Sequence, residues 1–111
     1  MNILYDRSVS PVQRVFWTGL SGTRYEFQHF PIGTVFNPVG GVYIFCKAAG
    51  PNNWHAVYVG ETDNFLRRLT NELATHHRWD AICRIGATHV SALVTAVKPK
   101  GRQSRLICDM P

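Results

Sequence analysis

Two short apolar runs lie near the middle of the chain, at residues 41–45 (GVYIF) and 56–60 (AVYVG). Residues 50–53 (GPNN) lie between them and combine residue types that break regular structure and let a chain reverse direction. This pattern predicts a β-hairpin that carries one tyrosine on each strand.

A helix is predicted directly after this hairpin, over residues 63–75. Thr62 and Asp63 are residue types that cap the N-terminus of a helix. The apolar residues that follow recur at helical spacing: Phe65, Leu66, Leu69 and Leu73. The hairpin is therefore expected to lead into a helix whose first turns carry Arg67 and Arg68.

A second hairpin is predicted nearer the N-terminus. Residues 14–18 (RVFWT) and 23–30 (TRYEFQHF) have the aromatic and β-branched composition of strands, and Gly19 and Gly22 favour a turn between them. Alternation along the second strand places Tyr25, Phe27 and His29 on one face and Glu26, Gln28 and Phe30 on the other. We expect the first of these faces to pack inward, which makes His29 structural rather than catalytic.

Three further elements complete the pattern. Residues 80–86 (DAICRIG) predict a short helix that ends at Gly86, residues 88–94 predict a third central strand, and residues 102–110 predict a last helix. The order of elements predicts an α+β fold, a single domain with a mixed or antiparallel central sheet flanked by helices. With 111 residues, the chain has the length of one domain.

Composition excludes several classes of protein. The chain is 45% hydrophobic and 17% charged, which is neither a disordered nor a membrane-embedded composition, and it contains no apolar run of about 18 residues. Its start lacks the pattern of a secretion signal, so we expect a cytoplasmic protein without a membrane partner. The three cysteines show neither disulfide nor zinc-site spacing, and we expect them to be reduced: Cys46, Cys83 and Cys108.

The net charge of the chain indicates the kind of partner that the protein binds. The net charge is +5 and the pI is about 9.5, a balance that favours polyanions such as nucleic acid. Much of the excess lies near the end, where it forms either a solvated face or a set of phosphate contacts: Lys98, Lys100, Arg102 and Arg105.

The two tyrosine runs also carry a resemblance. The triplets at 41–43 (GVY) and 58–60 (YVG), followed by Asn64 and by Arg68 and Leu69, resemble the signature of the GIY-YIG nuclease superfamily, whose members cut phosphodiester bonds in DNA. The resemblance covers residues 41–94, and the flanking residues 23–36 (TRYEFQHFPIGTVF) are similar to the leading segment of small single-domain bacterial members. It implies a GIY-YIG-like core over 41–111, preceded by an N-terminal extension with a hairpin over 1–40.

The resemblance implies catalytic roles for several side chains. Tyr43 and Tyr58 align with the paired tyrosines that orient or deprotonate the attacking water, and Arg68 aligns with the arginine that contacts the scissile phosphate. A planar guanidinium suits that contact because it donates two bonds to phosphate oxygens. His76 and His77 lie further along and can approach the site, although at least one of them is expected to be an exposed loop residue.

Other residues are candidates for contact with the substrate. Gly60 lacks a side chain, which leaves room for a nucleic-acid backbone, and Asn64 and Arg67 are further candidate contacts. A second interpretation pairs Arg68 with Glu72 at the surface, at i,i+4 spacing. Trp54 is either a packing residue or a base-stacking contact.

The metal site is the main departure from the family pattern. The resemblance implies Mg²⁺ or Mn²⁺ held by a glutamate on a late helix, but the chain has no glutamate after Glu72. Depending on the alignment, Gln103 or Ile107 takes that position, and neither replaces a carboxylate ligand. Asp109 is the nearest carboxylate, and the chain also ends before the family's closing asparagine, as a truncated domain would.

Three functions therefore remain open at this stage. The first is a metal-assisted DNA endonuclease whose activity is impaired by the lost glutamate, with specificity supplied by a partner protein. The second is a non-catalytic nucleic-acid-binding module of the same fold. The third is a small structural or protein-interaction domain in which the two tyrosines only pack.

Overall fold

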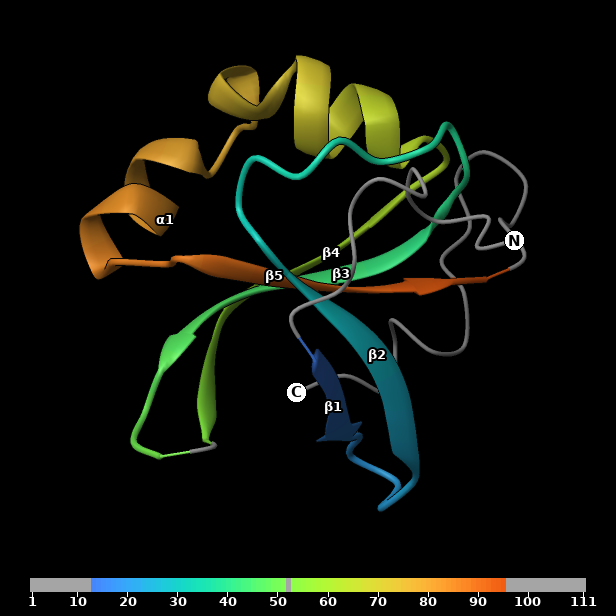
Figure 1. Ribbon diagram of the computed structural model, residues 1–111, viewed down its shortest axis with the longest axis vertical. Helices are drawn as coiled ribbons and strands as arrows, with labels where there is room; N and C mark the ends of the chain where they lie inside the picture. Colours follow the sequence, from blue (N-terminus) through green and yellow to red (C-terminus); the bar gives the residue numbers. More distant parts are fainter. Residues whose placement is uncertain (1–12, 52, 96–111) are drawn as a thin grey trace.

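Both predicted hairpins are present, and a fifth strand joins them into one sheet (Figure 1). This computed structural model describes residues 13–51 and 53–95. The strands are β1 (Gln13–Thr18), β2 (Arg24–Pro31), β3 (Gly41–Ala48), β4 (Trp54–Thr62) and β5 (His89–Val94). Their order in the sheet is β1-β2-β5-β3-β4, and every pairing is antiparallel. The described residues thus form a curled antiparallel sheet in a small α+β fold.

The N-terminal hairpin belongs to this sheet. Within it, Thr18 pairs with Arg24 across a turn in which the Gly22 N–H donates to the carbonyl of Gly19. Gly22 has φ of 88°, the left-handed conformation that glycine adopts at low cost. β2 then pairs with β5, so a long-range contact connects the first hairpin to the tyrosine hairpin.

The prediction of a single helix over 63–75 is wrong, because the segment contains two short helices of other types. The segment is a π-helix, η1 (Leu66–Asn71), followed by a 3₁₀-helix, η2 (Leu73–Thr75). The Glu72 N–H donates to the carbonyl of Arg67, five residues back, which is the π-helical pattern. The sequence periodicity did not distinguish this winding from an α-helix.

The predicted cap of this segment also differs. The side-chain oxygen of Asn64, rather than that of Asp63, accepts the Arg67 N–H at 3.0 Å. Thr62 Oγ1 accepts the Asn64 N–H at 3.2 Å, so Thr62 stabilises the turn before the helix. Asn64 is therefore used structurally through its carbonyl oxygen.

The second predicted helix is confirmed as α1 (Trp79–Ile85). It ends at Gly86, whose φ of 99° closes the helix in the left-handed conformation. Figure 1 shows that η1, η2 and α1, coloured yellow to orange, cover one face of the sheet. No helix in the described part of the chain is both long and apolar enough to cross a membrane.

The core consists of two clusters on opposite faces of the sheet. The cluster under the helices includes Phe30, Tyr43, Phe45 and Phe65, and the opposite cluster includes Phe27, Val42 and Ile44. The prediction that the face of β2 with Phe27 packs inward is confirmed, and Phe30 on the other face is equally buried. The helical layer covers that second face.

A loop over residues 32–40 holds the π-helix against the core. Thr70 Oγ1 donates to the Thr34 carbonyl at 3.0 Å and accepts the Phe36 N–H at 3.1 Å. Phe36 is buried, and its ring meets those of Phe30 and Phe65. These contacts fix η1 above the sheet and so fix the position of Arg68.

The pairing of β3 with β5 leaves no room for a side chain at Gly41, which leads to a first prediction. A Cβ at this position would overlap the main-chain carbonyl of Leu93 in β5. Gly41→Ala should therefore lower the free energy of unfolding by about 2 kcal/mol, since backbone atoms must move. The measurement is urea unfolding. Ala48→Gly, at the exposed end of the same strand, is the control and should cost about 1 kcal/mol or less; equal losses in the two variants would contradict the crowding argument.

Candidate functional site

The two tyrosines of the hairpin lie on the same face of the sheet. Tyr43 pairs with Gly60 across β3 and β4, while Tyr58 pairs with Phe45, so the tyrosines are offset by two residues. Their ring centroids are 6.3 Å apart. The prediction that the hairpin brings both side chains to one face is confirmed.

A β-bulge interrupts β4 directly before Tyr58. The register passes from Phe45 opposite Tyr58 to Cys46 opposite Ala56, and Val57 is the extra residue. Tyr58, Gly60 and Thr62 pair in continuous register with Phe45, Tyr43 and Gly41, so alternation from the end of β4 already places Tyr58 on the tyrosine face. The bulge instead turns Ala56 to the opposite cluster. The extra residue reverses the alternation, an effect that bulges often have beside functional sites.

Gly60 makes room for Tyr43 itself. A Cβ at Gly60 would overlap Cζ and Oη of the Tyr43 ring. The space that the sequence assigned to a nucleic-acid backbone is thus occupied by a phenol from the neighbouring strand. Gly60 is better described as the residue that lets Tyr43 lie flat across β4.

Two histidines from the turn before α1 bind the two tyrosines. Tyr43 Oη lies 2.7 Å from His76 Nε2, and Tyr58 Oη lies 3.2 Å from His77 Nε2. The two imidazoles stack with centroids 4.7 Å apart. The site therefore contains two adjacent tyrosine–histidine pairs that link the sheet to the helical layer.

The backbone fixes the tautomer of His76. The Arg78 N–H donates to His76 Nδ1 at 3.1 Å, so Nδ1 carries no proton in the neutral ring. The proton is on Nε2, which donates to Tyr43 Oη. The hydroxyl proton of Tyr43 consequently points away from His76. Sequence reasoning missed the contribution of Arg78, because a main-chain N–H carries no residue-type signal.

Burial divides the site into two layers. Tyr43 and His76 are only 2% and 4% exposed, whereas Tyr58 is half-buried and His77 is exposed. Burial, reinforced by Tyr58, raises the pKa of Tyr43, and Arg68 opposes part of that effect. Burial, with His77 and Arg68 nearby, lowers the pKa of His76 to about 4. The inner pair is therefore neutral at physiological pH, and the outer pair is the one that a substrate can touch.

Arg68 supplies positive charge beside the inner pair. It lies half-buried within η1, close enough to influence the pKa of both Tyr43 and His76. Within the described ranges no carboxylate forms an ion pair with it. The alternative pairing of Arg68 with Glu72 is not found there, because Glu72 lies 3.9 Å from Arg67 instead.

Arg67 differs from Arg68 in having acidic partners. Its guanidinium lies 2.6 Å from Asp63 and also reaches Glu72. All these side chains are about half exposed, so the pairs stabilise the fold only slightly. They nevertheless offset the charge of Arg67, so of these two neighbouring arginines Arg68 is the one without an acidic partner among the described residues.

Trp54 and His29 lie away from the tyrosine site. His29 is buried, and its Nδ1 lies 2.8 Å from Ser91 Oγ, in keeping with a structural residue. Trp54 packs on the rings of His29 and His89, with centroids 4.2 and 4.7 Å away. Trp54 thus has a packing role.

The described residues do not provide a metal site. Among residues 13–51 and 53–95, no group of three or more His, Cys, Asp or Glu side chains is placed to hold a metal ion. A Mg²⁺ or Mn²⁺ ion needs carboxylate oxygens, and the side chains that converge here are phenols, imidazoles and a guanidinium. The sequence candidates Gln103, Ile107 and Asp109 lie outside the described residues.

Comparisons with known proteins add no further constraint. No protein-family model matches the chain, and neither the curated proteins nor the solved structures contain a match. Roles for Tyr43, Tyr58, Arg68, His76 and His77 therefore depend on their geometry and on the resemblance of the motif.

The buried histidines predict a specific dependence of stability on pH. The pKa values of His29 and His76 are both lowered to about 4, from an ordinary 6.5. Between these values the unfolded chain binds more protons than the folded one, so the free energy of unfolding should fall as the pH falls from about 6.5 to about 4. Each histidine should contribute on the order of 2 kcal/mol.

Urea unfolding at several pH values measures this dependence. His76→Gln removes one titrating group, so its stability should vary less steeply with pH than that of the unmodified chain. Parallel curves for the two proteins would show that His76 does not carry the effect.

Proposed function

We propose that this chain is a GIY-YIG-like DNA nuclease domain that binds a backbone phosphate against Tyr58, His77 and Arg68. The observation that carries the proposal is the convergence of two tyrosine–histidine pairs beside an arginine without an acidic partner in the described chain. These side chains come from β3, β4, η1 and the turn before α1. A set of side chains that only packed would not need an unpaired cation.

Arg68 is the phosphate ligand in this proposal. A guanidinium remains charged at all physiological pH values and donates hydrogen bonds in a fixed fork. A π-helical turn often occurs at functional sites, and here it carries Arg68 beside the Tyr43–His76 pair. The overall charge of +5 attracts DNA to the same protein.

The outer tyrosine–histidine pair is the candidate for proton transfer. Tyr58 Oη lies between solvent and His77, so a water that donates to Tyr58 can pass a proton through the hydroxyl to Nε2 of His77 when that nitrogen carries no proton. The inner pair is unsuited to this role, because His76 Nδ1 is occupied by the Arg78 N–H and the pKa of Tyr43 is raised. Tyr43 and His76 instead position the outer pair and Arg68.

The metal requirement separates the proposed nuclease from a second candidate. Mg²⁺ or Mn²⁺ would offset charge on the phosphate when bound. Of the three residues near the expected ligand position, Asp109 has a carboxylate, Gln103 has only a neutral amide oxygen, and Ile107 has no ligand atom. The lack of a glutamate after Glu72 in the sequence favours a domain that binds DNA with little or no cleavage. In either case a partner protein or the shape of the DNA would supply specificity, since the domain is small.

The different pairing of the two arginines leads to a prediction about DNA binding. Arg68→Ala should weaken binding and reduce the slope of log K against log[salt] by about one unit, because one phosphate contact is lost. Arg67→Ala is the matched control and should have a smaller effect, since Asp63 and Glu72 already neutralise that side chain. Equal slopes for the two variants in a salt titration would mean that only general charge is involved.

Cleavage gives a separate prediction. With Mg²⁺ or Mn²⁺, the chain should nick supercoiled plasmid slowly, and Tyr58→Phe should abolish nicking while DNA binding persists. Either Gln103→Glu or Ile107→Glu should increase nicking, because one of the two positions corresponds to the family's metal-binding glutamate and the substitution would restore that carboxylate.

The control for the Tyr58 variant is Tyr25→Phe, which alters a half-buried tyrosine on β2 outside the site. Unchanged nicking in Tyr58→Phe would refute the proton-transfer role. DNA binding without nicking in all variants would favour the binding module.

A further inference from the structure

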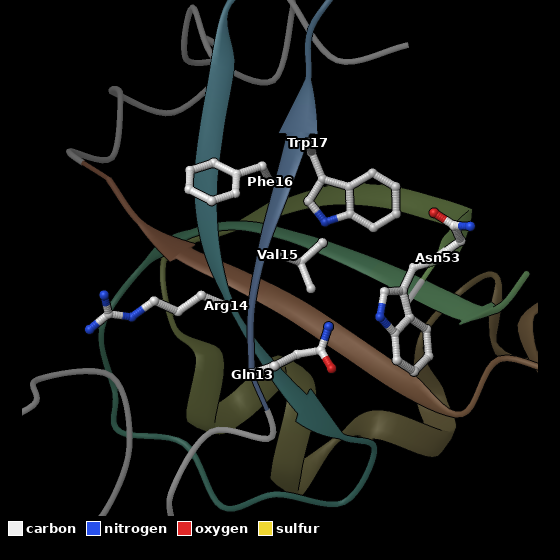
Figure 2. Close-up of a pocket in the computed structure, with 7 residues that line it drawn as sticks. Gln13, Arg14, Val15, Phe16, Trp17 and Asn53 are labelled. Atoms are coloured by element: carbon white, nitrogen blue, oxygen red, sulfur yellow. The ribbon is translucent and has the colours of Figure 1, made fainter. Parts of the chain in front are cut away.

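A separate pocket of about 350 Å³ lies on the side of the sheet that faces away from the helices (Figure 2). It is lined by β1 and by the start of β4, the two outermost strands of the sheet. Figure 2 shows the side chains of Gln13, Val15 and Trp17 directed toward Asn53, whereas Arg14 and Phe16 point away, as alternation along β1 requires. The curl of the sheet brings these two edges together around the pocket.

Cross-strand pairing places this pocket on the face opposite the tyrosine site. The Trp17 indole N–H donates to Ser91 Oγ at 3.1 Å, and Ser91 pairs directly with Ile44 of β3. Ile44 and its neighbour Tyr43 face opposite sides of the sheet. The pocket and the tyrosine site therefore share no side chain and can be tested independently.

Interior contacts fix both aromatic walls of the pocket. The bond to Ser91 holds the ring of Trp17, while the rings of His29 and His89 support that of Trp54. His29 and His89 are themselves stacked, with centroids 5.0 Å apart. A ligand that stacks here meets indole surfaces that are already ordered, which lowers the entropic cost of binding.

The polar groups around the pocket are neutral. Gln13 and Asn53 contribute side-chain amides, which both donate and accept hydrogen bonds. Burial, with His89 nearby, lowers the pKa of His29 to about 4, so the imidazole behind Trp54 is uncharged at physiological pH. The guanidinium of Arg14 lies toward Glu26, at 3.4 Å. The pocket therefore suits an uncharged planar ring rather than a phosphate.

Two buried polar atoms next to the pocket remain without a hydrogen bond in the described structure. They are Nε1 of Trp54 and Nε2 of His29, which belong to rings in direct contact. Such atoms are uncommon in folded proteins, and each calls for a polar partner. A ligand with donors and acceptors on its rim can provide one after a small movement of the Trp54 ring.

We propose that this pocket binds an unpaired nucleobase, stacked on Trp17 or Trp54 with its polar edge toward the amides of Gln13 and Asn53. Indoles bind bases of any sequence by stacking, and side-chain amides pair with base edges, most favourably with adenine. The base belongs either to a free nucleoside or to a single strand. This site goes beyond the proposed nuclease centre and does not depend on it.

The indole N–H signals in the NMR spectrum of the unmodified protein provide the test. The chain has three tryptophans, and Trp79 is the internal control because it lies on α1 and packs on Phe45 in the other core cluster. Millimolar adenosine should shift the signals of Trp17 and Trp54 but not that of Trp79. A short single-stranded oligonucleotide and its abasic counterpart form the second arm of the experiment.

Each outcome decides the proposal. Shifts with adenosine assign the pocket to a free base, and shifts with the oligonucleotide but not with its abasic counterpart assign it to a base in a strand. No shift with either ligand, or equal shifts of Trp79, would overturn the proposal. Trp54→Ala should weaken adenosine binding about tenfold or more, and Trp79→Phe should not. Arg68→Ala should leave these shifts unchanged, which separates this site from the phosphate site.

Discussion

The hydrogen bond between Tyr43 Oη and His76 Nε2 is the contact on which the rest of the site depends. It joins the central sheet to the turn between η2 and α1, and both partners are almost fully buried. Two features make this bond possible. Gly60 has no side chain and leaves space for the phenol, and the Arg78 main-chain N–H donates to the other nitrogen of the imidazole, Nδ1. Once His76 is fixed, stacking places His77 over the sheet edge, where it meets Tyr58. The buried pair thus determines the geometry of the exposed one.

Local patterns in the sequence were sufficient to predict the two hairpins, α1 and β5. Their signals are short range, such as period-two alternation along β2 and the glycine that ends α1. The sheet order was not predictable in this way, because the position of β5 between β2 and β3 depends on pairings between residues more than 40 positions apart. The π-helix was missed for a related reason. Its extra residue per turn is stabilised by contacts of Thr70 with the 34–36 loop, which lie outside the periodicity of the segment.

The members of the candidate site were predictable, but their division of roles was not. The motif brought together Tyr43, Tyr58 and Arg68, and nearness in sequence added the two histidines. Residue type alone did not distinguish the two tyrosines. Burial keeps Tyr43 uncharged and out of contact with solvent, whereas Tyr58 remains accessible. The bulge at Val57 is equally invisible in the sequence, and it turns Ala56 to the opposite core cluster while Tyr58 keeps the register of Gly60. A one-residue irregularity in β4 therefore sets the face of residues 54–56 and leaves both tyrosines on one face.

Under the proposed function, the charges of the site would also couple phosphate binding to protonation. Burial lowers the pKa of His76, and the positive charge of Arg68 lowers it further. A phosphate bound to Arg68 would bring negative charge to the same place, so it would oppose that electrostatic effect and raise the pKa of His76. By linkage, protonation of His76 would strengthen phosphate binding by the same factor. Protonation cannot occur at Nε2, which already carries a proton, so it must occur at Nδ1 and displace the Arg78 N–H. The main-chain bond that orders the inner pair therefore also restrains it from becoming charged, and the site keeps Arg68 as its permanent cation.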